Sequence, residues 1–252
     1  MKPKALILTG YGINCEKETA LACKKAGADA TIVHAHYLLE GKVPLDAFGL
    51  ICFPGGFSFG DELGAGKALA SRLFALREAL DAFIRRGGCI LGICNGFQLL
   101  VKLGMLPGGD RQLATLASNS SERFENRWVR HIYSGSSPFL EGITSLDLPV
   151  RHGEGRLHLA PHCDLAAASA LLYYADAHGK ATESYPDNPN GSPRGVAGMT
   201  DSTGRILGMM AHPEAALYMM NRPDWTRLDK PAQEAGDGLK IFKNAVNYLR
   251  KS

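Results

Sequence analysis

A cysteine stands between two glycines in the segment Gly92-Ile93-Cys94-Asn95-Gly96. An apolar run at residues 89–93 leads into it, and a helix-like stretch at 97–103 follows. A nucleophile on a sharp, glycine-flanked turn between strand and helix is the nucleophile elbow of hydrolases, here with cysteine in place of serine. The positive end of the helix favours a thiolate, and the N–H of Asn95 can stabilise an oxyanion. We therefore predict that Cys94 is a catalytic nucleophile.

A base for this nucleophile is offered by His212-Pro213-Glu214, which follows the apolar run 206–210. A histidine just beyond a strand can accept the thiol proton, and a nearby carboxylate can fix the tautomer of its ring. Pro213 restricts the backbone between the two side chains. The pattern predicts a catalytic triad of Cys94, His212 and Glu214.

A glycine-rich loop at residues 54–61 follows another apolar run at 50–53. Its glycines allow backbone N–H groups to face a ligand. It is not a phosphate-binding P-loop, because Asp61 stands where the first glycine is required and Ala68 follows Gly66-Lys67. The glycine spacing of a dinucleotide-binding loop is absent as well. We expect the loop to supply the second half of an oxyanion hole.

The elements that must position these residues alternate in the first half of the chain between short apolar runs and helix-like stretches. This alternation predicts parallel strands joined by helical crossovers, with ligands at the carboxyl ends of the strands. No repeat or linker interrupts the chain, so we expect one domain over residues 1–252. The predicted strands are 5–8, 30–34, 50–53, 89–93, 128–133, 171–175, 195–200 and 206–210, and the predicted helices are 16–26, 68–86, 97–103 and 238–249.

Composition is that of a soluble globular protein, with 45% hydrophobic and 21% charged residues. A net charge of +3 argues against nucleic acid or an anionic membrane as the main partner. None of the six cysteines forms a C-x-x-C pair, which is typical of free thiols in a reducing compartment. No signal-peptide core and no 18-residue apolar stretch occur, so we expect a cytoplasmic protein.

Four segments resemble the class I glutamine amidotransferases: FPGGFSFGDELGAG at 53–66, GICNGFQ at 92–98, RHGEG at 151–155 and GMMAHPE at 208–214. Within that group, their combination resembles the glutaminase subunit of phosphoribosylformylglycinamidine synthase, an enzyme of purine biosynthesis. The similarity runs over nearly the whole chain, including GDGLKIF at 236–242. It implies a single class I amidotransferase domain of α/β type, with a mostly parallel central sheet flanked by helices.

The resemblance also implies roles for individual residues. Cys94 attacks the side-chain amide of glutamine and forms a glutamyl thioester, His212 is the base, and Glu214 orients it. The oxyanion hole is formed by the N–H groups of Gly55 or Gly56 and of Asn95. The implied glutamine-binding residues are Ser58, Gly60, Asp61, Gln98 and His152. One departure is Ala215, which stands where the family often has arginine.

The implied partner is a synthetase subunit that converts formylglycinamide ribonucleotide to formylglycinamidine ribonucleotide, with room for a small accessory subunit. Residues 118–124 resemble the stretch near that interface. We expect no cofactor in this subunit, and ATP and magnesium in the synthetase, because this chain lacks a nucleotide-binding motif. We predict no metal site: His158, His162 and Cys163 have ligand-like spacing, but Pro161 lies among them.

Two alternatives stay open. An amidotransferase subunit that serves another acceptor would share the elbow and the triad, although the GGFSFGD and HGEG segments disfavour it. A non-catalytic redox-sensing or chaperone-like protein on a related fold would keep the cysteine, but would not require His212 and Glu214.

Overall fold

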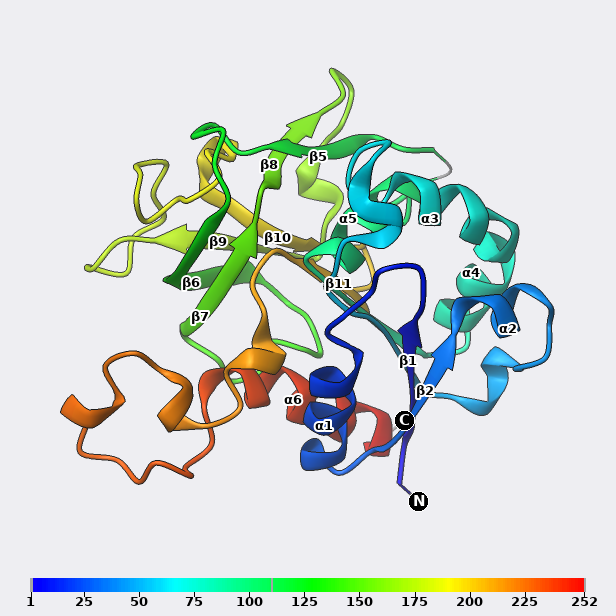
Figure 1. The fold of residues 1–252 in the computed structure, drawn as a ribbon, viewed down its shortest axis with the longest axis horizontal. Coiled ribbons are helices and arrows are strands. Elements are labelled where there is room, and N and C mark those ends of the chain that lie inside the picture. Colours follow the sequence, from blue (N-terminus) through cyan, green and yellow to red (C-terminus); the bar gives the residue numbers. More distant parts are fainter. Residues whose placement is uncertain (1, 110, 252) are drawn as a thin grey trace.

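A nine-stranded sheet lies at the centre of the structure, a computed structural model that describes residues 2–109 and 111–251. Its strands follow the order β2-β1-β3-β4-β11-β10-β9-β6-β7 (Figure 1, where β3 and β4 are not labelled). They are β1 (Lys4–Thr9), β2 (Asp29–His34), β3 (Leu50–Phe53), β4 (Cys89–Ile93), β6 (Glu125–Gly135), β7 (Leu146–His152), β9 (Ala170–Ala175), β10 (Val196–Thr200) and β11 (Ile206–Met209). A separate small sheet pairs β5 (Ala114–Ser118) with β8 (Glu154–Leu159).

The two halves of the large sheet differ in strand direction. From β2 to β11 the neighbouring strands are parallel, and from β11 to β7 they are antiparallel. The predicted α/β fold is confirmed, but the sheet is mixed where a mostly parallel one was expected. The reason is that parallel pairs need helical crossovers, which are confined to the first half of the chain, whereas antiparallel pairs need only turns.

Helices cover both faces of the parallel half. They are α1 (Glu16–Ala26), α2 (Ala35–Leu39), α3 (Lys67–Leu73), α4 (Arg77–Arg85), α5 (Asn95–Lys102) and α6 (Asp237–Lys251). The crossovers β1–α1–β2 and β3–α4–β4 run in opposite directions across the sheet. Because such crossovers are right-handed, α1 and α4 lie on opposite faces. The C-terminal α6 packs beside α1 (Figure 1), and α3 packs beside α5.

The buried strands β3 and β4 were the clearest signals in the sequence. Every residue of both is buried, as expected for strands covered on two faces, and their predicted bounds are confirmed to the residue. The other predicted strands and helices are present with small shifts in their bounds, with one exception. The helix predicted over 68–86 is divided into α3 and α4 by a 3₁₀ turn at Phe74–Leu76.

Three strands, β5, β7 and β8, were not predicted. Pro149 lies within β7, and proline argues against a central strand because it cannot donate a ladder hydrogen bond. The position of β7 explains this proline, because β7 is the last strand of its sheet, where proline is tolerated.

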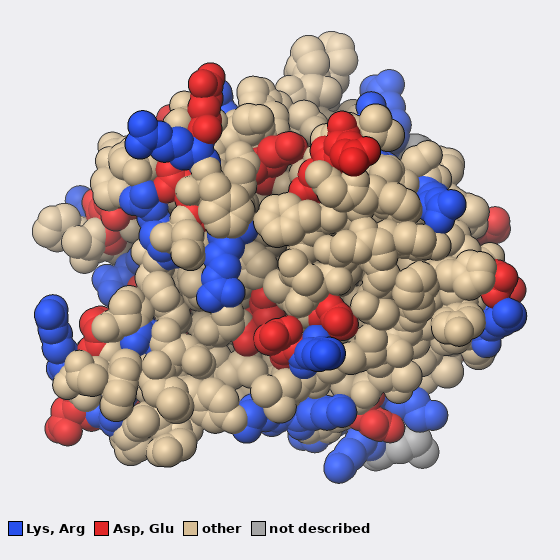
Figure 2. Space-filling view, in the orientation of Figure 1, with Lys and Arg blue, Asp and Glu red and all other residues tan. Residues whose placement is uncertain are grey.

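None of the helices in the described residues is long and apolar enough to span a bilayer. Acidic and basic residues are interspersed on the face shown in Figure 2.

Candidate active site

Cys94 occupies the corner between β4 and α5. Its backbone has φ 50° and ψ −105°, a conformation that non-glycine residues rarely adopt and that is concentrated at functional sites. Two hydrogen bonds hold the corner in place. The Cys94 N–H donates to Met209 O at 2.8 Å, and Cys94 O accepts from the N–H of Gln98 at 3.0 Å. The predicted elbow is therefore present, with its cysteine 6% exposed.

The glycines on either side of Cys94 are required by close packing. A Cβ on Gly92 would stand 2.8 Å from Gly96 O, and a Cβ on Gly96 would overlap the carbonyl oxygen of Phe53. Real Cβ atoms are not found at such distances, so any side chain at Gly96 would push α5 away from β3. Close packing is therefore the steric reason that glycines flank Cys94.

His212 reaches the elbow because β11 is the parallel neighbour of β4. Met209 of β11 pairs with Ile93 of β4. Cys94 is the next residue after Ile93, and His212 is the third residue after Met209, so both lie just beyond the same end of the sheet. His212 Nδ1 and Glu214 Oε1 are 2.6 Å apart, and both residues are buried. A carboxylate at this distance fixes the ring tautomer and leaves the other nitrogen, Nε2, for the thiol.

The edge strand β7, at the other end of the strand order, also reaches the site beside His212. A bridge joins Val150 of β7 to Ala211, and Pro149 O accepts the N–H of His212 at 2.8 Å. Cys94 Sγ lies 3.6 Å from Arg151 O. The thiol is therefore enclosed between the end of β4 and the end of β7, which excludes bulk water from it.

The electrostatic surroundings of His212 favour the imidazolium form. Burial lowers the pKa of His212, but the Glu214 carboxylate and contacts with the thiols of Cys94 and Cys15 outweigh burial and hold it well above its usual range. A base that becomes a stable imidazolium suits a cysteine nucleophile, because the cation stabilises the thiolate.

The residues predicted for the oxyanion hole surround the elbow. Asn95 begins α5, so its N–H belongs to the positive end of the helix. Gly55 lies against the imidazole, because a Cβ there would be 2.6 Å from Cε1 of His212. Gly56 and Ile13 form an isolated antiparallel bridge, but its hydrogen bonds are made by the residues on either side of them. The N–H of Gly56 therefore takes no part in the bridge.

Side-chain amides tie the glycine-rich loop to α5. Asn95 Oδ1 accepts the N–H of Ser58 at 3.2 Å, and Asn95 Nδ2 donates to Asp61 Oδ1 at 3.2 Å and to Gln98 Oε1 at 2.9 Å. Gln98 Nε2 in turn donates to Glu154 O at 2.5 Å. Gly60 turns the loop at φ +65°. The structure thus brings the predicted pocket residues of the loop and of α5 into one network.

His152 is the predicted pocket residue on β7. Its Nδ1 is 3.1 Å from Asn119 Oδ1, and the side chain is 2% exposed. Burial, together with the charge of His212, lowers the pKa of His152 to about 3. His152 is therefore neutral, and its Nε2 is buried with no hydrogen-bond partner in the described chain.

Three residues near the site were not singled out from the sequence. Cys15 contacts the His212 ring; Glu154 Oε2 accepts the N–H of Ala65 at 3.1 Å; and Asn119 holds His152. Glu154 lies in the RHGEG segment, which was a usable signal. Cys15 carried no signal, because it precedes an ordinary helix and only the fold brings it to His212.

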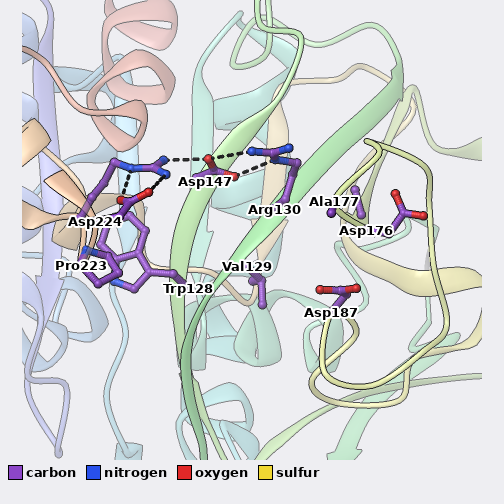
Figure 3. A pocket seen from close by; sticks show the side chains of 11 residues that line it. Trp128, Val129, Arg130, Asp147, Asp176, Ala177, Asp187, Pro223 and Asp224 are labelled. Carbon is purple, nitrogen blue, oxygen red and sulfur yellow. Dashed lines mark hydrogen bonds and ion pairs between the residues drawn. The ribbon is translucent and has the colours of Figure 1, made fainter. Parts of the chain in front are cut away.

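The residues considered for a metal site on sequence are not arranged on a helix. His158 belongs to β8, and His162 and Cys163 follow it in a turn. A hollow of about 540 Å³ lies elsewhere, between β6, β7 and the loop after Asn221 (Figure 3). Its Arg130 and Arg222 are already paired with Asp147, at 3.0 and 2.7 Å. No triad residue lines it.

Comparison with known proteins gives consistent results. The chain matches the family described as the CobB/CobQ-like glutamine amidotransferase domain over residues 2–249. It is 42% identical over 268 residues to phosphoribosylformylglycinamidine synthase subunit PurQ of Methanococcus maripaludis, covering 99% of this chain and 98% of that protein. It is 43% identical over 258 residues to subunit PurQ of Dehalococcoides mccartyi, covering 99% of each.

A solved structure of PurLQS from Thermotoga maritima has a TM-score of 0.75 and 28% identity, covering 99% of this chain and 100% of that one. The family predicted from the sequence motifs is confirmed. The chain belongs to the CobB/CobQ-like glutamine amidotransferases and, within them, to the PurQ subunits of phosphoribosylformylglycinamidine synthase.

Proposed function

We propose that this chain hydrolyses glutamine through Cys94, His212 and Glu214 and delivers the ammonia to a partner synthetase. The Cys94 thiolate attacks the side-chain amide carbon of glutamine. The oxyanion that forms accepts hydrogen bonds from the backbone N–H groups of Asn95 and of Gly55 or Gly56. His212 gives its proton to the leaving nitrogen, and ammonia departs from a glutamyl thioester. His212 then takes a proton from water, which attacks the thioester and releases glutamate.

One observation carries this proposal. A cysteine in a strained elbow shares a buried pocket with an imidazole that a carboxylate holds at 2.6 Å. A redox sensor needs only the reactive cysteine, so the His212–Glu214 pair favours the enzyme over the non-catalytic alternative. Family membership supports the same choice.

Glutamine binding is proposed for the network that joins the glycine-rich loop to α5. Ser58 Oγ is buried with no hydrogen-bond partner in the described residues, so it is available to a ligand. Burial and the nearby Glu154 carboxylate raise the pKa of Asp61, although the Gly66 N–H and Asn95 oppose them. Paired acids suit an ammonium group of the substrate, which would relieve their repulsion. Gln98, Gly60 and His152 complete the proposed pocket.

The partner is proposed to be the synthetase of phosphoribosylformylglycinamidine synthase, with a small accessory subunit. The structure that is 28% identical to this chain is of PurLQS. ATP and magnesium belong to the synthetase in this proposal. Ammonia must pass directly between the subunits, because water would protonate it to unreactive ammonium. We further propose the cytoplasm as the compartment, which suits six free cysteines.

The decisive experiment compares two nitrogen sources. The synthetase is supplied with formylglycinamide ribonucleotide and magnesium-ATP, with or without this chain. With glutamine, formylglycinamidine ribonucleotide should form only when the chain is present. With ammonium chloride, the synthetase alone should suffice. Glutamine hydrolysis without transfer to this acceptor would indicate a different synthetase, and absence of hydrolysis in every mixture would reject the proposed reaction.

A further inference from the structure

A second thiol shares the pocket of the triad. Cys15, which directly precedes α1, is half-buried against the imidazole of His212. Cys15 Sγ, a ring nitrogen of His212 and a carboxylate oxygen of Glu214 all lie within 4.8 Å of one another. Gly55 permits this approach, because a Cβ there would stand 2.6 Å from the ring and 3.4 Å from Cys15 Sγ.

Two polar atoms in this cluster are buried without a hydrogen-bond partner among the described residues. They are His212 Nε2 and Glu214 Oε2. Buried polar atoms are nearly always satisfied, so each exception requires an explanation. The proposed reaction uses His212 Nε2 to serve Cys94, but it gives no role to Glu214 Oε2 or to the Cys15 thiol. A thiol, an imidazole and a carboxylate together are a ligand set typical of zinc.

We propose that Cys15, His212 and Glu214 bind a thiophilic divalent cation of the zinc class, and that binding reversibly stops the glutaminase reaction. Zinc holds sulfur at about 2.3 Å and nitrogen or oxygen at about 2.0–2.2 Å, which places its ligand atoms roughly 3.5 Å apart. The three atoms now lie within 4.8 Å of one another, so binding requires the Cys15 and Glu214 side chains to rotate and the 2.6 Å contact between His212 and Glu214 to be replaced by bonds to the ion. The half-buried Cys15 gives the ion access from solvent.

Binding exchanges protons for the cation. The Cys15 thiol loses its proton as the sulfur–metal bond forms, and the His212 imidazolium loses the proton of the nitrogen that binds the cation, so two protons are released for each ion bound. An imidazole whose nitrogen holds the cation cannot take the proton of Cys94, and Glu214 no longer orients the ring. The inhibition half of this inference rests on the proposed function, whereas cation binding does not.

The first test measures binding without turnover. The full chain is alkylated with iodoacetamide with and without Zn²⁺, and the modified cysteines are identified by mass spectrometry. We expect Zn²⁺ to protect Cys15 and to leave Cys163, the other half-buried free cysteine, unprotected. Co²⁺ should give a sulfur-to-metal charge-transfer band that the Cys15→Ser variant lacks. Equal alkylation of Cys15 with and without Zn²⁺ would overturn the proposal.

The second test measures zinc inhibition of glutamine hydrolysis, with each variant normalised to its own rate without zinc. Cys15→Ser should raise the half-inhibitory Zn²⁺ concentration at least about tenfold, because loss of groups that support a metal costs this much. Cys163→Ser should leave it unchanged. Equal inhibition of the wild type and Cys15→Ser would show that Cys15 does not bind the inhibiting ion and would reject this site. Protection of Cys15 in a chain without glutaminase activity would retain the site and reject the proposed function.

Discussion

Ile93 and Met209 lie opposite each other in neighbouring parallel strands, and this pairing sets the geometry of the site. Parallel strands end at the same edge of a sheet. Cys94 follows Ile93 directly, and His212 follows Met209 by three residues, so the nucleophile and its base reach one edge from distant parts of the chain. The hydrogen bond from the Cys94 N–H to Met209 O, at 2.8 Å, fixes the position of Cys94 along the strand direction relative to the end of β11, which His212 follows.

Replacing the nucleophile tests its role directly. Cys94→Ser should lower kcat for glutamine hydrolysis by roughly 10⁴-fold or more, because serine is a far weaker nucleophile beside an imidazolium than a thiolate is. The change of one atom should leave Tm nearly unchanged. Ammonia release is the measurement, and Cys163→Ser is the control. A Cys94→Ser protein that keeps a tenth of the activity would exclude Cys94 as the nucleophile.

Glu214→Gln tests the orienting carboxylate. The variant should lower kcat by roughly 10²- to 10⁴-fold, since the ring loses its preferred tautomer. Because Glu214 helps to hold the pKa of His212 above its usual range, its loss should lower that pKa. The imidazolium would then deprotonate at lower pH, and the alkaline limb of the kcat/KM profile should move to lower pH.

The control for this variant is Glu78→Gln on the exposed surface of α4, which removes the same charge away from the site. Its pH profile should match that of the wild type. An alkaline limb that stays in place in Glu214→Gln would show that the carboxylate does not govern the imidazole.

The elbow should also be sensitive to a single methyl group. In Gly96→Ala, the Cβ overlaps Phe53 O, so α5 and β3 must separate, and the free energy of unfolding should fall by about 3 kcal/mol. Gly179→Ala is the matched control. That glycine has φ +74° with nothing within 4 Å of a Cβ, so only backbone strain of about 1 kcal/mol is expected. Equal costs in urea denaturation would contradict the packing argument.

The sequence predicted the triad because its signals are local. Cys94 lies between glycines that packing requires, and His212 and Glu214 are separated by a single proline. Each motif follows a buried apolar run, and such runs are unambiguous when both faces of a strand are covered. These features depend on neighbours in the chain, so they can be recognised without knowing the fold.

Other features depend on contacts between distant segments, and such contacts leave no local signal in the sequence. Strand β7 was not predicted, and its Pro149 argues against a central strand. Only the complete sheet shows that β7 lies at the edge, where proline is tolerated. The antiparallel half could not be distinguished from a parallel one, since strand direction is set by the connections. Cys15 resembles any cysteine before a helix, and its contact with His212 is possible because Gly55 beside them has no Cβ.

Acid should destabilise the protein partly through His131, a buried residue of β6 whose ring packs on Tyr174 with centroids 5.3 Å apart. Burial lowers the pKa of His131 from 6.5 to about 4 and outweighs nearby backbone groups and Asp147. The folded protein therefore keeps this ring neutral down to about pH 4, while the unfolded chain protonates it below about 6.5. Stability from this group is complete above 6.5 and falls as the pH drops through that window, by about 1.4 kcal/mol per pH unit.

His131→Phe removes the titrating group and keeps an aromatic ring against Tyr174. Urea unfolding at pH 8 measures the packing effect alone, because histidine is neutral there in both states. Between pH 6.5 and 4, the free energy of unfolding of the variant should depend on pH less steeply than that of the wild type, by the equivalent of one proton. Parallel curves for the two proteins across this window would mean that His131 takes up its proton at the same pH in the folded state as in the unfolded chain, which its burial in the apolar core argues against.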